Sequence, residues 1–133
     1  MSNFTDVGDF HRKFGLATSD TKAGPSPYND ELLDFRIRFM HEELDEFVEG
    51  LEENDDAKMF DALLDLVYVA MGTAHLLGYP WEIGWNAVQA ANMKKQRAAA
   101  DGSDSKRGSS FDVVKPPGWA PPDIEKVLGA VGF

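Results

Sequence analysis

Residues 39–47, FMHEELDEF, and residues 60–65, FDALLD, carry the pattern that decides the fold. The carboxylates recur three and four residues apart in the first segment and four apart in the second, beside apolar side chains, which is the spacing of one face of an α-helix. An acidic connection separates the two segments. If this short connection makes the helices antiparallel, their carboxylates face each other across a helical bundle.

The carboxylates of this pattern are candidate metal ligands. Glu42, Glu43 and Glu46 crowd adjoining faces of the first helix, while Asp61 and Asp65 lie four residues apart on the second. Like charges at this density raise carboxylate pKa values or recruit cations. Oxygen ligands without His or Cys suit Mg²⁺ or Mn²⁺. The two aspartates carry the strongest case, because an unpaired Asp in an apolar helix is costly.

A di-iron carboxylate bundle is the competing metal site. That site requires a Glu-x-x-His pair on each of two helices. His41 instead precedes the glutamates, and His75 has Met71 and Gly72 where a Glu would be needed. The spacing therefore favours a site made of carboxylates alone.

Hydrophobic spacing predicts an all-α fold, a four-to-five-helix antiparallel bundle that forms oligomers. Apolar residues occur on nearly every side of the helix expected at about residues 56–77. This distribution is typical of a helix surrounded by neighbours, partly from another subunit. We expect one domain over residues 1–133, with its core at about 30–97, a mobile loop at 98–110 and a C-terminal arm. The expected helices cover residues 3–14, from 27–30 to about 51, about 56–77, and 80 to about 97, with a short helix starting at 121 or 122.

Composition narrows the partners and the compartment. The net charge of −10 disfavours DNA or RNA, which usually bind a basic face. The absence of cysteine excludes disulfides and thiolate metal sites and suits a cytoplasmic protein. The polar start predicts no secretory signal. We expect no membrane partner, because the most apolar run, residues 63–70, is short and begins among aspartates.

With these motifs the chain resembles the all-α nucleoside triphosphate pyrophosphohydrolases, which include MazG-like enzymes, phosphoribosyl-ATP pyrophosphohydrolases and dimeric dUTPases. The resemblance spans roughly residues 30–97 and rests on EELDE at 42–46, DALLD at 61–65 and NMKK at 92–95. FHRKFG at 10–15 and PPGWAPPD at 116–123 are similar to a compact single-domain branch found in phages and bacteria.

The resemblance implies Mg²⁺-dependent hydrolysis of a (deoxy)nucleoside triphosphate between the α and β phosphates, giving a monophosphate and diphosphate. It suggests control of dNTP pools, with dGTP, dUTP and dCTP as candidate substrates. Glu43, Glu46 and Asp65 would be the catalytic metal ligands, with Glu42 as a helper. The family's second motif is commonly Glu-x-x-Asp, whereas this chain has Ala62 in the Glu position. Asp61 is the candidate replacement, which leaves the number of metal ions open.

The substrate contacts are also implied by the resemblance. Asn92 and Lys95 match the family's Asn-x-x-Lys and would contact phosphates, for which Lys is a compact point charge. His11 and Lys115 are further substrate-binding candidates, although His11 could be structural and Lys115 part of a packing strap. We expect a homodimer or homotetramer. The alternative is a non-catalytic nucleotide-sensing or helical assembly module, which the Ala62 departure supports.

Overall fold

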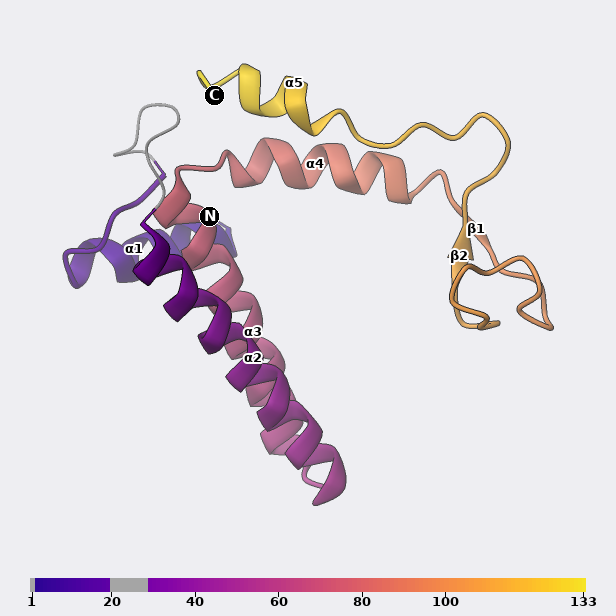
Figure 1. The fold of residues 1–133 in the computed structure, drawn as a ribbon, viewed down its shortest axis with the longest axis horizontal. Coiled ribbons are helices and arrows are strands. Elements are labelled where there is room, and N and C mark those ends of the chain that lie inside the picture. The colour runs from indigo at the N-terminus through magenta and orange to yellow at the C-terminus, as the bar shows by residue number, and fades with distance from the viewer. Residues whose placement is uncertain (1, 20–28) are drawn as a thin grey trace. The chain divides into compact units, whose positions relative to one another are not determined.

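The computed structural model describes residues 2–19 and 29–133. It confirms the all-α fold class, since helices dominate and the described strands have two residues each. Its described residues form two compact units, one reaching residue 81 and including 130–133, the other covering 82–129. The elements, shown in Figure 1, are α1 (Asn3–Lys13), α2 (Asp30–Glu52), α3 (Asp56–Leu77), α4 (Trp81–Asn92), β1 (Gln96–Arg97), β2 (Val113–Val114) and α5 (Ile124–Gly129).

Polar caps fix where the two long helices begin. The side chain of Asn29 accepts a hydrogen bond from the Leu32 N–H before α2, and Asp55 accepts one from the Lys58 N–H before α3. Asp55 therefore caps α3 at the acidic connection. The alternative start of α2 at residue 27 lies outside the described residues.

The prediction that the fourth helix continues to residue 97 is wrong. α4 ends at Asn92, and Gln96 and Arg97 pair with residues 114 and 113 in an antiparallel ladder. The Ala98 N–H extends the pairing by donating to the Asp112 carbonyl over 3.0 Å. Strand pairing with a distant segment overrides the local helical pattern, and residues 94–97 alone do not reveal that partner.

The contact between α2 and α3 follows a seven-residue repeat, and the two helices lie side by side along their length (Figure 1). The buried positions of α2 are Arg36, Glu43 and Gly50, so its inward row is not apolar. Gly50 permits close approach, because a Cβ there would lie 3.0 Å from the Met59 backbone nitrogen. The matching buried row of α3 includes Ala62, Val69 and Leu76.

α1 packs on the end of α3 around a histidine. The His75 ring stacks on Phe4, with ring centroids 3.7 Å apart. Its Nδ1 accepts the Ser19 N–H over 3.1 Å, so its Nε2–H is the atom that donates to the Phe4 carbonyl, over 2.9 Å. This core cluster contains Phe4, Val7, Met71 and Ala74, with Tyr79 and Trp81 against it.

Arg36 is buried to 8 % exposure beside Gly72. Its Nε donates to Thr73 Oγ1 and its Nη2 to the Val69 carbonyl, each over 3.1 Å. Burial lowers the pKa of its guanidinium. A Cβ on Gly72 would collide with Arg36 Nη2 and would lie 2.8 Å from His11 Nε2. The absence of a side chain at Gly72 thus leaves room for the buried guanidinium of Arg36.

We expect Gly72→Ala to lower the free energy of unfolding by about 1–3 kcal/mol, because overpacking must displace Arg36 from two hydrogen bonds. Gly84→Ala is the matched control in α4, where the nearest atom, Val127 Cγ1, lies 4.0 Å from the new Cβ. Replacing this helical glycine should raise stability by roughly 0.5–1 kcal/mol. Urea unfolding measures both changes. Unchanged stability in Gly72→Ala would contradict the packing described for Arg36.

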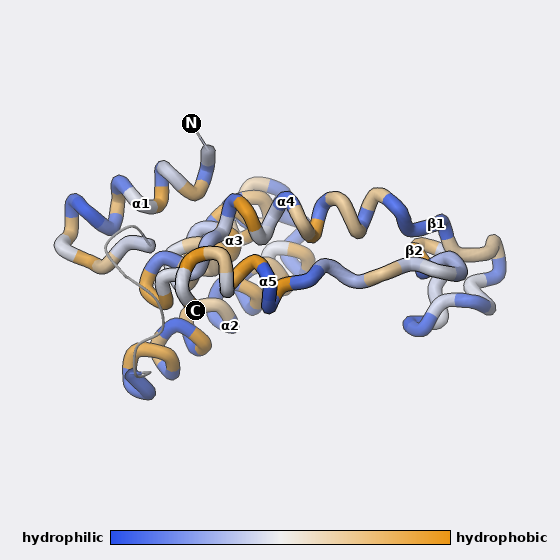
Figure 2. The backbone as a smooth tube through the Cα atoms, turned by 90° about the horizontal axis from the view of Figure 1, so that it is seen from above, coloured by the Kyte–Doolittle hydropathy of each residue, from blue (hydrophilic) through white to orange (hydrophobic). Residues whose placement is uncertain are grey.

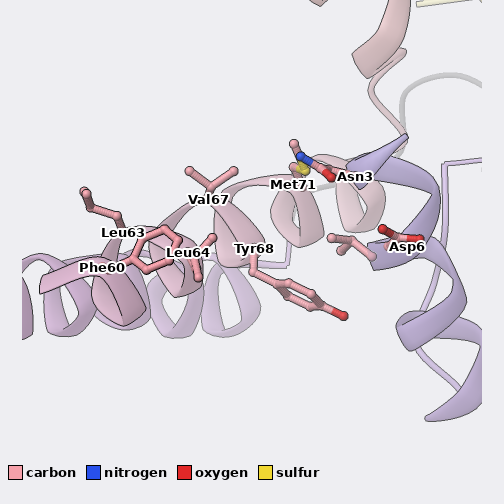
Figure 3. Close-up of a pocket in the computed structure, with 9 residues that line it drawn as sticks. Asn3, Asp6, Phe60, Leu63, Leu64, Val67, Tyr68 and Met71 are labelled. Atoms are coloured by element: carbon pink, nitrogen blue, oxygen red, sulfur yellow. The ribbon is translucent and has the colours of Figure 1, made fainter. Parts of the chain in front are cut away.

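The long helices also expose apolar rows. Figure 2 shows that hydrophobic residues, in orange, recur along α3. Together with Asn3 and Asp6 of α1, the α3 row lines a groove of about 400 Å³ (Figure 3). Its exposed members are Phe60, Leu63, Leu64, Val67 and Tyr68. The exposed row of α2 includes Ile37, Leu44, Val48 and Leu51.

The sequence argument against a membrane span is corrected for α3. By length and composition, Asp56–Leu77 is long and apolar enough to cross a membrane, although the apolar run at 63–70 is short. The central helix of a helical assembly passes the same test. The absence of a membrane partner therefore stays a prediction.

Candidate active site

Three of the predicted ligands meet across the α2–α3 hairpin. Glu43 and Glu46 extend from successive turns of α2, and Asp65 extends from α3. One carboxylate oxygen from each residue lies within 4.8 Å of the other two. The antiparallel arrangement expected from the short connection therefore brings the two motifs together.

Glu43 is the most buried member of this three-carboxylate cluster, at 7 % exposure. Its pKa is raised to about 7, first by burial and then by the charges of Glu46 and Asp65 and a hydrogen bond with Glu46. Its Oε2 is buried and has no hydrogen-bond partner among the residues that the structure describes. A buried oxygen in this state is costly unless a proton or a cation satisfies it.

The cluster fits a divalent cation. It offers three carboxylate oxygens, the ligand type that Mg²⁺ and Mn²⁺ prefer. Within residues 2–19 and 29–133, the ion pairs of Lys and Arg go to other carboxylates, and none reaches these three. A bound cation would offset the repulsion and satisfy Glu43 Oε2.

The other two candidate ligands lie outside the cluster. Glu42 is exposed, and its charge makes the smallest contribution to raising the pKa of Glu43. Asp61 is exposed as well, whereas Ala62 is buried to 1 % exposure. Successive helical residues point about 100° apart, so Asp61 faces solvent where Ala62 faces inward. The ligand roles of Glu42 and Asp61 stay predictions.

His11 is held in the interior of the first unit. It is 2 % exposed, and its Nδ1–H donates to the Ala17 carbonyl over 2.7 Å. Burial lowers its pKa, and the nearby His75 and Arg36 lower it further. The hydrogen bond from the buried, neutral His11 ring to Ala17 therefore holds the segment that follows α1 against the core. A contact between His11 and substrate stays a prediction.

The remaining substrate candidates lie in the second unit. Asn92 is exposed at the end of α4. Lys95 and Lys115 come together on Trp119, with their Nζ atoms 5.3 and 5.0 Å from the ring centroid. The Trp119 Nε1–H donates to the Ala91 carbonyl over 2.7 Å, which fixes the indole to α4. The proline-rich arm thus brings one candidate lysine to the other.

Two features of these sites were missed from the sequence. Arg36 lies seven residues before Glu43, two turns along the same face of α2, and this spacing could have revealed it. Lys106 and Arg107 border the pocket that also contains Lys95, but their loop has no local pattern that predicts it.

The family model described as phosphoribosyl-ATP pyrophosphohydrolase matches residues 7–92, more than half of the chain and all of the three-carboxylate cluster. The chain belongs to the phosphoribosyl-ATP pyrophosphohydrolase family. No curated protein matches the chain.

The phosphoribosyl-ATP pyrophosphohydrolase family belongs to the all-α NTP pyrophosphohydrolase superfamily, which has MazG-like members, as the motifs predicted. Membership makes the chain a hydrolase, a nucleotide pyrophosphohydrolase whose substrate is a nucleotide. The family is typically Mg²⁺-dependent, in agreement with the donor set of the cluster.

Stability without metal should fall as pH rises, because of Glu43. Its pKa of about 7 in the fold exceeds its ordinary value of 4.5, so the folded protein binds this proton more tightly than the unfolded chain. The stabilisation is complete below about pH 4.5 and is lost by the time pH passes about 7. Thermal melts in EDTA across this range measure the change.

Glu43→Gln is the control for this pH effect. It removes the titrating proton while keeping the shape of the side chain, so the melting temperature should depend less on pH. Other carboxylates and the net charge of −10 act on both proteins alike. Identical pH profiles for the two proteins would contradict the shifted pKa of Glu43.

Proposed function

We propose that this protein hydrolyses a (deoxy)nucleoside triphosphate between its α and β phosphates, using Mg²⁺ held by Glu43, Glu46 and Asp65. Mn²⁺ would serve in the same donor set. The single observation that carries the proposal is the buried Oε2 of Glu43, which has no partner and lies among two further carboxylates. Such a site costs stability in the free protein, and a cation bridging to phosphates offsets that cost.

Each ligand has a separate part in binding. Glu43 fixes the buried side of the cation site, while Glu46 and Asp65, which are partly exposed, form its open side. Bound Mg²⁺ supplies charge neutralisation on the phosphates and activates water for the displacement. Deprotonation of Glu43 is needed for binding, so cation affinity should weaken below about pH 7.

The substrate class is the finer part of the proposal. The name of the matched family points to phosphoribosyl-ATP, whereas the motif phrases resemble a compact branch that acts on dNTPs. Both kinds of substrate share the triphosphate, which is the part that a metal and lysines recognise. We favour a dNTP, with dGTP, dUTP and dCTP as candidates and dNTP pool control in the cytoplasm as the role. Asn92 and Lys95 are the proposed phosphate contacts.

A substrate panel with a diphosphate readout tests the function. The panel contains dGTP, dUTP, dCTP, ATP and phosphoribosyl-ATP, each with and without Mg²⁺. We expect diphosphate and the monophosphate from at least one dNTP only when Mg²⁺ is present. Release of orthophosphate would contradict cleavage between the α and β phosphates. Mg²⁺-dependent nucleotide binding without hydrolysis would instead support the nucleotide-sensing alternative.

We also propose that a second copy of the chain covers the apolar row of α3, giving a homodimer or a homotetramer. Phe60 is 65 % exposed and Leu64 is 54 % exposed on this row. Large apolar surfaces of this kind are typical of interaction sites. The row begins beside the helix turn that carries Asp65, so assembly and the metal site share one helix.

A further inference from the structure

The second unit contains a pocket of about 350 Å³ that is rich in cations. It lies beside the β1–β2 ladder, where Figure 2 shows hydrophilic residues in blue. The chain has 13 Lys and Arg residues and a net charge of −10, so four cations at one pocket are a marked local reversal of charge. The charged lining residues are Lys95, Asp104, Lys106, Arg107, Asp112 and Lys115.

The two carboxylates of this pocket are already engaged by neighbouring donors. Asp112 Oδ2 accepts a hydrogen bond from the Ser105 hydroxyl over 2.7 Å. Arg107 Nη1 donates to both oxygens of the same carboxylate, over 2.9 Å to Oδ1 and 3.0 Å to Oδ2. These bonds help to lower the pKa of Asp112, which keeps it ionised at neutral pH. Asp104 Oδ1 accepts the Ala99 N–H over 2.8 Å. The expected loop is therefore closed by its own side chains, and Arg107 is the cation that these bonds neutralise.

The three lysines are left without carboxylate partners in the part of the chain that the structure describes. Lys95 and Lys115 both contact the Trp119 ring, which its bond to Ala91 holds in place. A cation over an indole keeps its N–H groups available to a ligand. Lys106 adds a third ammonium from the loop between β1 and β2.

We propose that this pocket binds a small polyphosphate, a diphosphate or triphosphate group that is either free or the end of a nucleotide. Several anionic oxygens on one compact ligand match several ammonium groups that line one open pocket. An acidic protein or a nucleic acid would meet repulsion from the net charge of the chain. Assignment to the end of a nucleotide rests on the proposed function, whereas binding of free diphosphate does not.

Calorimetric titration of the full chain with sodium diphosphate and triphosphate, in EDTA and at low salt, tests the pocket. The triple variant Lys95→Ala, Lys106→Ala, Lys115→Ala should bind each at least about tenfold more weakly. Lys126→Ala, on α5 and outside the pocket, should bind like the wild type. Circular dichroism checks that the variants are folded. The single variant Lys106→Glu reverses one charge of the pocket, at a side chain that has no described hydrogen bond.

Nucleotide kinetics separate the two sources of the ligand. A raised KM in the triple variant identifies the end of a nucleotide, whereas an unchanged KM with lost diphosphate affinity identifies free diphosphate. Absence of binding by the wild type, unchanged affinity in the triple variant, or an equal loss in Lys126→Ala would overturn the proposal. Diphosphate binding by a protein that hydrolyses no nucleotide would sink the proposed function alone.

Discussion

Replacing Asp65 with Asn should lower the Mg²⁺-dependent hydrolysis rate by about 10²–10⁴-fold, while the metal-free protein becomes more stable. The rate should fall because one of the three proposed carboxylate ligands is lost, and metal stabilisation of the transition state is worth several kcal/mol. Stability rises because the substitution removes a charge that repels Glu43 and Glu46. The two effects have opposite signs, which a simple loss of folding cannot produce.

Diphosphate release at saturating Mg²⁺ measures the first effect, and thermal melts in EDTA measure the second. We expect the melting temperature to rise by a few degrees, about what 1 kcal/mol gives in a domain of this size. Asp45→Asn is the matched control, because Asp45 is exposed on α2 and lies outside the cluster. Full activity in Asp65→Asn would remove this residue from the metal site.

The double variant Phe60→Glu, Leu64→Glu should convert the proposed oligomer into monomers. Each apolar side chain contributes roughly 1.5–3 kcal/mol when buried, and each new carboxylate adds the cost of an unpaired charge in the interface. Together these changes weaken association by at least about 10³-fold. Sedimentation equilibrium over a range of protein concentrations measures the dissociation constant.

Phe111→Glu is the control for this interface. Phe111 is an exposed apolar residue of the second unit and is not a member of the α3 row, so its replacement should leave the proposed oligomer intact. A wild-type protein that is monomeric at micromolar concentrations would contradict the assembly proposal. Flotation of the wild type with lipid vesicles would show that the apolar row of α3 meets a membrane instead.

The helices and the three-carboxylate cluster could be predicted because both follow from local spacing. Residues three and four apart share a helix face, and a short turn folds two such faces together. The position of Asp61 could not be predicted from spacing alone. The rotation of α3 about its axis buries Ala62 and turns Asp61 toward solvent. That rotation is set by packing along the whole helix.

Features that join distant segments could not be predicted from local sequence patterns. The pairing of residues 96–97 with 113–114 ends α4 early and forms one side of the lysine pocket. The burial of Arg36 was missed because a charged residue on a helix is usually read as exposed. On α2 the usual pattern is reversed at two positions, because the apolar Leu44 is exposed and the charged Arg36 is buried.

The seven-residue repeat of α2 also constrains how this chain can change in length. One inserted or deleted residue between Arg36 and Glu43 would turn everything beyond it by about 100° and carry Glu43 away from Asp65. A whole seven-residue insertion would restore the face to within about 20°. The middle of α2 can therefore vary by substitution but not by small insertions or deletions, because its residue count encodes the site.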